Sequence, residues 1–156
     1  MNPPSNTDHD KMSRALGNLV QNCAAIELLL VSWLQEISTD RELVALLLSQ
    51  RVVGRTREMI AALVDSRAPN IATETRAALE LAKQASQVRN VVCHNPRLLR
   101  EDLSDGPWHR MDKFDAMPTN LEDVKAAATK SVEAGKSLHQ LYVKHFGREP
   151  RLDTEF

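Results

Sequence analysis

The hydrophobic residues of the chain recur at intervals of three and four positions over most of its length, which is the spacing of amphipathic helices. The longest pattern includes Leu19, Cys23, Ile26, Leu30, Trp33 and Leu34. The predicted helices cover residues 13–37, 40–49, 50–66, 71–94 and 120–146. Strand patterns do not alternate with these segments, so the sequence predicts an all-α bundle of four to five helices.

Local signals mark the ends of several of these helices. Thr39-Asp40-Arg41-Glu42 and Thr119-Asn120-Leu121-Glu122 each match a capping box, in which Thr and Glu side chains satisfy free backbone N–H groups. Asn95-Pro96 ends the fourth helix, because the residue before proline avoids the helical region. Gly147 is the expected stop of the last helix.

The same pattern gives the domain organisation. Residues 1–11 are rich in Pro, Asn and Asp, which predicts a disordered N-terminal arm with no signal peptide. Residues 12–147 form one helical domain, and residues 148–156 form a tail. Within the domain, residues 97–118 combine an Asp-Gly-Pro turn with isolated aromatic residues, which predicts an irregular loop or a small β-hairpin.

Composition narrows the class of protein. The chain has 156 residues, of which 42% are hydrophobic and 26% charged, as expected for one globular domain. Two cysteines cannot build a disulfide framework, and no Gly-rich phosphate loop, Ser triad or Cys/His zinc pattern occurs. The longest apolar run, residues 23–34, is interrupted by Glu27 and is too short to span a bilayer. We therefore expect a cytoplasmic protein without a metal, a cofactor or a membrane anchor.

Charge is nearly balanced over the whole chain but not along it. The formal net charge is −1, yet residues 51–100 carry 9 basic and 4 acidic groups, a net +5, between two segments of net −3. Such a basic segment can bind phosphate even in a neutral protein. Arg51, Arg55 and Arg97 are its candidate substrate-binding residues, and a solvated surface with surplus arginine is the alternative interpretation.

Two charged residues occupy positions where the helical pattern calls for apolar ones. Glu27 falls among Val20, Cys23, Leu30 and Leu34, and Arg89 falls among Ala78, Ala82, Ala85 and Val92. An unpaired buried charge is costly, so we expect Glu27 and Arg89 to pair with each other. Two roles remain open for this pair: a structural salt bridge, or a carboxylate that orients an anion-binding arginine.

His94 adds candidate chemistry to this pair. It lies in the last turn of its predicted helix, where the helix dipole favours a protonated imidazole. Asn90 precedes it by four residues and shares its flank, whereas Arg89 lies about 140° away around the helix and must curl to reach the same ligand. The spacing thus predicts a guanidinium, an amide and an imidazole around one helix end, which suits a phosphate group.

The run Arg89-Asn90-Val91-Val92-Cys93-His94 reads R-N-x-x-x-H and resembles the signature of the HEPN family (higher eukaryote and prokaryote nucleotide-binding domains). A run of this kind arises by chance in roughly one in fifty chains of this composition. The resemblance covers residues 13–146 and implies a small all-α bundle, in many members a metal-independent ribonuclease. The family pattern carries over onto Arg89, Asn90 and His94, and Glu27 looks like the acidic residue that many members place on an earlier helix.

The resemblance also implies a mechanism and partners. The ribose 2′-OH would attack the adjacent phosphorus, with His94 as base or acid and Arg89 holding the phosphate oxygens. One copy supplies one such histidine, so the family's usual answer, a homodimer with two facing motif helices, is expected. A role as a toxin or a phage-defence component would add an antitoxin partner, such as a minimal nucleotidyltransferase.

Two other interpretations stay open at the level of sequence. One is a non-catalytic HEPN module that binds a nucleotide or a partner protein. The intact R-N-x-x-x-H run favours the ribonuclease over this module, whereas the net charge of −1 counts against the ribonuclease. The other is a helical dimer in which the Glu27–Arg89 pair is only structural. The remaining histidines, His9, His109, His139 and His145, are interpreted as surface or helix-end residues, and Cys93 has no base beside it.

Overall fold

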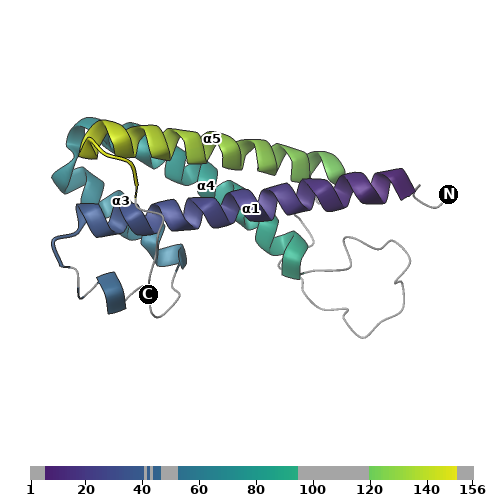
Figure 1. Ribbon diagram of the computed structural model, residues 1–156, viewed down its shortest axis with the longest axis horizontal. Coiled ribbons are helices and arrows are strands. Elements are labelled where there is room, and N and C mark those ends of the chain that lie inside the picture. The colour runs from purple at the N-terminus through teal and green to yellow at the C-terminus, as the bar shows by residue number, and fades with distance from the viewer. Residues whose placement is uncertain (1–5, 41, 43, 47–52, 95–119, 151–156) are drawn as a thin grey trace.

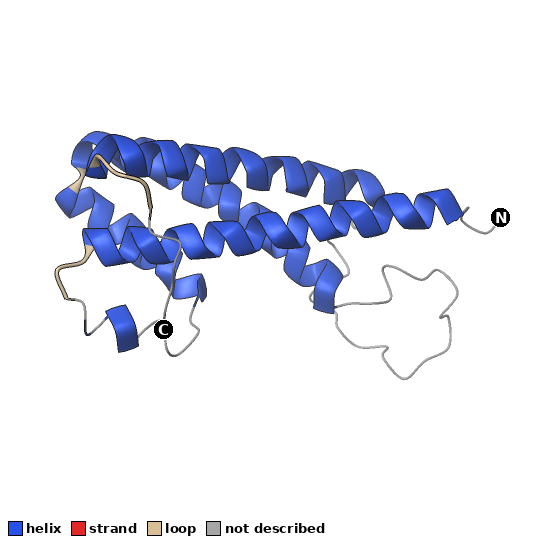
Figure 2. Cartoon of the chain, in the orientation of Figure 1, coloured by secondary structure: helices blue, strands red, loops and turns tan. Residues whose placement is uncertain are grey.

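The computed structural model describes residues 6–40, 42, 44–46, 53–94 and 120–150 of the chain. Its helices are α1 (Asn6–Ile37), α3 (Val53–Arg67), the short 3₁₀ helix η1 (Pro69–Ile71), α4 (Ala72–His94) and α5 (Leu121–Phe146). Residues 42 and 44–46 are also helical, and the described residues contain no strand (Figure 2). The predicted all-α bundle is confirmed.

Three long helices run the length of the molecule (Figure 1). α1 and α5 lie side by side with the same chain direction, and α4 crosses them in the opposite direction while packing along both. α3 covers only the C-terminal half of α1, where η1 connects it to α4. The bundle therefore has a four-helix end and a three-helix end.

Large side chains fill the four-helix end. Trp33, Leu34, Ile60, Val64, Leu138 and Tyr142 are each at most 1% exposed. The rings of Trp33, Tyr142 and Phe146 meet at centroid distances of 4.7–5.8 Å, and the Trp33 indole N–H donates to the Leu138 carbonyl at 3.1 Å. Because the only polar atom of the Trp33 side chain is satisfied, its burial carries no desolvation penalty.

Small side chains fill the three-helix end. Its buried cluster is formed by Ala15, Leu19, Cys23, Ala85, Val92, Val124 and Ala127, which come from α1, α4 and α5. Alanine and cysteine allow the three helix backbones to approach closely where no fourth helix is available to cover a wider core. The Glu27–Arg89 pair lies where these two ends join.

Two predicted helix starts differ from the structure. α1 begins at Asn6, so residues 6–11 belong to this helix and not to a disordered arm. Farther along this helix, Met12 and Ala15 pack into the three-helix core. α3 begins at Val53, three residues after the expected start at Gln50, and ends at Arg67.

The capping box of α5 is one residue out of register with its prediction. Asn120 caps α5, since its side chain accepts from the Asp123 N–H at 3.0 Å and the Asp123 carboxylate accepts from the Asn120 N–H at 3.2 Å. Asn is a stronger cap than Thr, so the adjacent frame wins here. At the other predicted box the Val44 N–H donates to the Asp40 carbonyl, and residues 41 and 43 lie outside the described residues.

The ends of α4 and α5 agree with their predictions. α4 ends at His94, and α5 ends at Phe146 followed by Gly147 in the left-handed region with φ of 67°, whose N–H donates to Val143. After Gly147 the chain folds back, because Arg148 pairs with Glu36 of α1. The predicted insert at 97–118 lies outside the described residues, as do residues 41, 43 and 47–49 of the predicted short helix.

By length and composition α1 could also cross a membrane, over Asp10–Ile37. Core helices of globular bundles meet the same criteria. In this molecule Leu19, Trp33 and Leu34 are fully buried against the other helices. Length and composition therefore do not distinguish whether α1 is a membrane span or a core helix.

Candidate functional site

Glu27 of α1 and Arg89 of α4 form the ion pair that the sequence predicts. Arg89 Nη2 donates to Glu27 Oε1 at 2.7 Å. The two side chains keep 25% and 30% of their surface exposed, so the pair lies at the edge of the buried face and not within it. Val20, expected beside Glu27 in the core, is correspondingly 37% exposed.

Glu27 does not use up the donors of Arg89. Arg89 Nε is buried and has no hydrogen-bond partner among the described residues. A guanidinium has five N–H donors, and the carboxylate takes one of them at 2.7 Å. Glu27 therefore orients Arg89, and the remaining N–H donors of Arg89 can still bind a further acceptor.

Arg57 of α3 interacts electrostatically with this pair, and the sequence analysis did not single it out. The pKa of the Arg57 guanidinium is lowered, chiefly because burial removes water from the charge, while the nearby Glu27 raises it and Arg89 lowers it further. Arg57, Ile60 and Val64 are spaced by three and four residues, and the latter two are fully buried. The periodicity test that identified Glu27 and Arg89 would thus have identified Arg57 as well.

Cys23 lies one helical turn before Glu27 and is only 1% exposed. Burial raises the pKa of its thiol, and Arg89 together with a hydrogen bond from Ser86 acts in the opposite direction. Cys93, in contrast, is exposed on the last turn of α4. Cys23 therefore stays a neutral thiol. It belongs to the three-helix core and lies on the side of that core nearest to the Glu27–Arg89 pair.

The rest of the R-N-x-x-x-H run lies at the end of α4. Asn90 and His94 are exposed, and neither forms a hydrogen bond with another described residue. Val91 and Val92 between them are buried and anchor this turn to the bundle. Within the run, the Arg89 guanidinium is therefore held by Glu27, whereas the His94 imidazole is open to solvent.

The predicted substrate-binding arginines are only partly described. Arg55 is exposed on the first turn of α3, two residues before Arg57. Arg51 and Arg97 lie outside the described residues. Among the described side chains, no group of three or more His, Cys, Asp or Glu residues is arranged to hold a metal ion.

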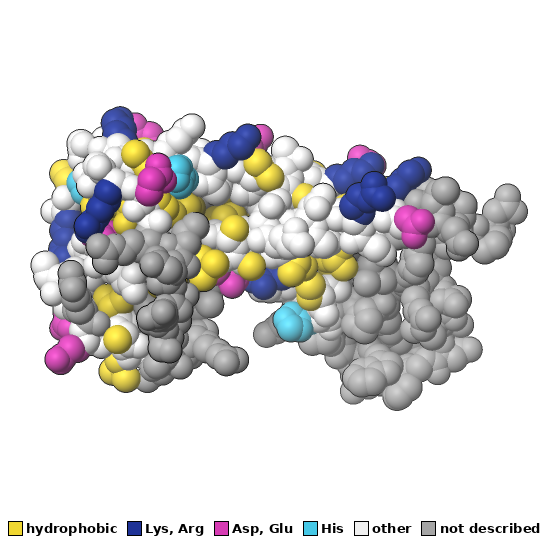
Figure 3. All heavy atoms as spheres, viewed as in Figure 1, with side chains coloured by type: hydrophobic (Ala, Val, Ile, Leu, Met, Phe, Trp, Pro, Cys, Tyr) yellow, Lys and Arg dark blue, Asp and Glu magenta, His cyan; other side chains and the backbone are white. Residues whose placement is uncertain are grey.

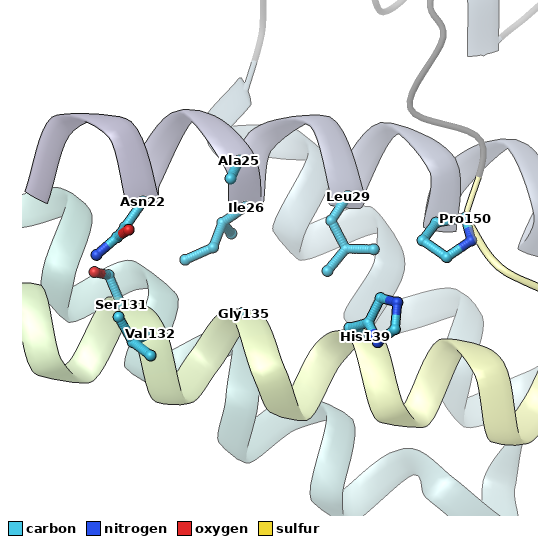
Figure 4. A pocket seen from close by; sticks show the side chains of 9 residues that line it. All are labelled: Asn22, Ala25, Ile26, Leu29, Ser131, Val132, Gly135, His139 and Pro150. Atoms are coloured by element: carbon cyan, nitrogen blue, oxygen red, sulfur yellow. The ribbon is translucent and has the colours of Figure 1, made fainter. Parts of the chain in front are cut away.

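A separate groove lies between α1 and α5 (Figure 4). Its volume is about 280 Å³, and its lining is formed by Asn22, Ala25, Ile26, Leu29, Ser131, Val132, Gly135, His139 and Pro150. His139 closes one end by pairing with Glu149 at 2.7 Å, so its imidazole is engaged with the start of the tail. The groove contains none of the predicted site residues.

Comparison with known proteins adds no family assignment. No protein family, curated protein or solved structure matches this chain. The functional argument consequently rests on the residues and their geometry.

Proposed function

We propose that the protein is a metal-independent endoribonuclease of HEPN type. The observation that carries the proposal is the Glu27–Arg89 pair, which orients a half-buried guanidinium five residues before the exposed His94 at the end of α4. A fixed cation and an accessible imidazole are the groups that phosphodiester cleavage needs when no metal takes part.

In the proposed reaction the ribose 2′-OH attacks the adjacent phosphorus and the 5′-oxygen leaves. The products are a 2′,3′-cyclic phosphate and a 5′-OH end. His94 takes the proton from the 2′-OH or gives one to the leaving oxygen, and Arg89 stabilises the charge on the non-bridging oxygens. Asn90 positions the phosphate, while Arg51, Arg55 and Arg97 hold the flanking RNA.

The proposal includes a homodimer, because one histidine does not readily serve both proton transfers. α1 offers a suitable surface for a second copy. Exposed positions of α5 include Glu122, Lys125, Lys130, Glu133, Lys136 and Lys144, whereas exposed positions of α1 between residues 17 and 35 carry no charge. The uncharged face of α1 consists of Gly17, Val20, Gln21, Ala24, Leu28, Val31 and Gln35.

This face is complementary to itself in the antiparallel sense. A twofold axis at Ala24 would place Val20 opposite Leu28 of the partner subunit and Gly17 opposite Val31 of the partner subunit. Figure 3 shows hydrophobic side chains along the middle of α1. Glu27 borders the same face, so the two Glu27–Arg89 pairs would lie near the axis.

We place this activity in the cytoplasm, where RNA is available and free cysteines stay reduced. A toxin or phage-defence role, with an antitoxin that silences the enzyme, belongs to the same proposal. Such a partner would need to cover the end of α4 to prevent RNA from reaching His94.

The direct test incubates tRNA and mRNA with the wild-type protein and with His94→Ala, both in EDTA. We expect cleavage by the wild type, 2′,3′-cyclic phosphate at the product ends and no effect of EDTA. His145→Ala is the matched control, because His145 occupies the last turn of α5 as His94 does in α4. Cleavage that persists in His94→Ala would remove the acid–base role, and a wild type that cleaves no RNA would favour the non-catalytic binding module.

A further inference from the structure

The chain that follows α5 returns along the groove between α1 and α5. Arg148 pairs with Glu36 near the C-terminal end of α1, and Glu149 pairs with His139 of α5 at 2.7 Å. Pro150 then lines the groove at its His139 end (Figure 4), and every α1 residue of that lining precedes Glu36 in the sequence. The segment therefore runs antiparallel to α1 and is fixed to both helices where it enters the groove.

Beyond Pro150 the groove presents apolar surface that the described helices leave uncovered. Its lining there includes Ile26 of α1 and Val132 of α5, and the Val132 side chain is 40% exposed. Gly135 keeps this part of the groove open, because a Cβ at that position would already contact Ile26 Cγ1 at 3.6 Å. An apolar side chain that enters the space beside Gly135 is removed from water, which is favourable.

The residues after Pro150 alternate between charged and less polar side chains. Residues 151–156 read Arg-Leu-Asp-Thr-Glu-Phe and lie outside the described residues. Successive side chains of an extended segment point to opposite sides. An extended conformation would therefore place Leu152, Thr154 and Phe156 on one face and the three charged residues on the other, which suits an apolar surface bordered by water.

The reach of this segment matches the groove. From Leu29 to Asn22 the α1 side of the lining extends about 10 Å, at about 1.5 Å per helical residue. An extended chain rises about 3.3 Å per residue, so Leu152 would lie roughly 7 Å beyond Pro150, level with Ile26. Lys136 is exposed on α5 directly after Gly135, where its ammonium suits the acidic residues on the outer face of the segment.

We propose that residues 151–156 bind in the α1–α5 groove of their own chain, with Leu152 packed beside Ile26, Val132 and Gly135. The ion pairs of Arg148 and Glu149 hold the start of the segment at the groove, which gives it an effective concentration on the order of millimolar. A segment of the same chain therefore needs fewer contacts than a separate partner does. The inference is independent of the proposed function, because the groove contains none of the predicted site residues.

Methyl NMR of the full chain tests this docking directly. Leucine, isoleucine and valine methyl groups are labelled, and NOEs report which of them are in contact. Gly135→Leu fills the groove, since its side chain starts beside Ile26. Gly17→Leu is the matched control, because it also replaces a glycine inside a long helix, whereas a Cβ at Gly17 would contact no described residue. Circular dichroism confirms that both variants fold.

We expect NOEs from the Leu152 methyl groups to Ile26 and Val132 in the wild type and in Gly17→Leu, and loss of these NOEs in Gly135→Leu. A wild type without them overturns the proposal, and so does a folded Gly135→Leu that retains them. An isotope-filtered spectrum of mixed labelled and unlabelled chains identifies whose segment is bound. If the NOEs arise only between two chains, the occupant belongs to a second copy and the assignment to the same chain is wrong.

Discussion

The two ends of the bundle solve the problem of burying α1 in different ways. At the four-helix end, Trp33, Leu34 and Tyr142 fill a wide core, and the one polar atom of the Trp33 side chain is satisfied by Leu138. At the three-helix end, Ala85, Cys23 and Ala127 fill a narrow one. Where the two meet, a carboxylate of α1 and a guanidinium of α4 form an ion pair at the edge of the core.

This contrast separates what stabilises the fold from what supplies chemistry. Large apolar side chains contribute most of the burial free energy, and their end carries no candidate catalytic group. The junction instead contains a held guanidinium with an unsatisfied donor, which is costly for stability and useful for binding. Substitutions at the four-helix end should therefore mainly lower stability, and substitutions at the junction should mainly lower RNA cleavage.

The largest expected effect is on catalysis. His94→Ala should reduce RNA cleavage by about 10²–10⁴-fold, as is typical when a general acid–base group is lost. Its Tm should change little, because His94 is exposed at the end of α4. Single-turnover cleavage and a thermal melt of the same preparation test both halves. A large fall in Tm would mean that His94 belongs to the scaffold.

Trp33→Ala should give the opposite signature. Removing this fully buried ring should lower the free energy of unfolding by roughly 3–5 kcal/mol, through lost burial and the cavity left behind. Denaturant titration measures the loss. At temperatures where the variant stays folded, its cleavage rate per folded molecule should match the wild type. A rate loss in the folded variant would show that the two ends are coupled.

Arg89→Ala should affect both properties, since it lies where the ends join. Cleavage should be lost, and the free energy of unfolding should fall by about 1–3 kcal/mol because Glu27 loses its partner. This is less than for a fully buried pair, since both side chains are partly exposed. Urea titration and cleavage assays on one preparation give both values.

Glu27→Gln is the milder companion of that change. It keeps the shape and a hydrogen-bond acceptor for Arg89 but removes the charge. We expect a smaller loss of both stability and cleavage than in Arg89→Ala. If Glu27→Gln equals Arg89→Ala in its effect on cleavage, the carboxylate takes part in the reaction beyond orienting the arginine.

The smallest expected effect is alkaline destabilisation through Cys23. Burial raises the pKa of its thiol above the ordinary value of 9.0, so the unfolded state loses this proton before the folded state does. The stability contributed by the thiol is complete below pH 9.0 and is lost as the pH rises through the folded pKa. Urea titrations between pH 8 and 10 should show this slope in the wild type and not in Cys23→Ala.

The part of the candidate site that follows from helical periodicity and from the pairing of opposite charges was predictable. Arg89 and Glu27 stood out because each interrupts an apolar stripe, and two such charges of opposite sign are best satisfied by each other. The Glu27–Arg89 pairing is confirmed at 2.7 Å. Arg57 follows the same rule on α3, where it shares the stripe of Ile60 and Val64, but the net charge of residues 51–100 does not reveal the position of a single arginine.

Helix boundaries were less predictable than helix faces. Two overlapping capping frames occur at 119–123, and the sequence alone permits both. At 119–123 the chain uses Asn120 with Asp123, where the side chains exchange both hydrogen bonds. α1 likewise begins at Asn6, several residues before the start that the local pattern predicts.

By itself, the sequence determined the all-α class, the buried stripes of the long helices and the opposite charges that must meet. These follow from periodicity and from the cost of burying a charge, which are local properties of each helix. Only the tertiary structure decided that Glu27 and Arg89 lie at the edge of the core, that Arg57 interacts with them electrostatically and that α1 keeps an uncharged face open. Those facts depend on which helix covers which side of its neighbour, because burial is set by the packing of all the helices together.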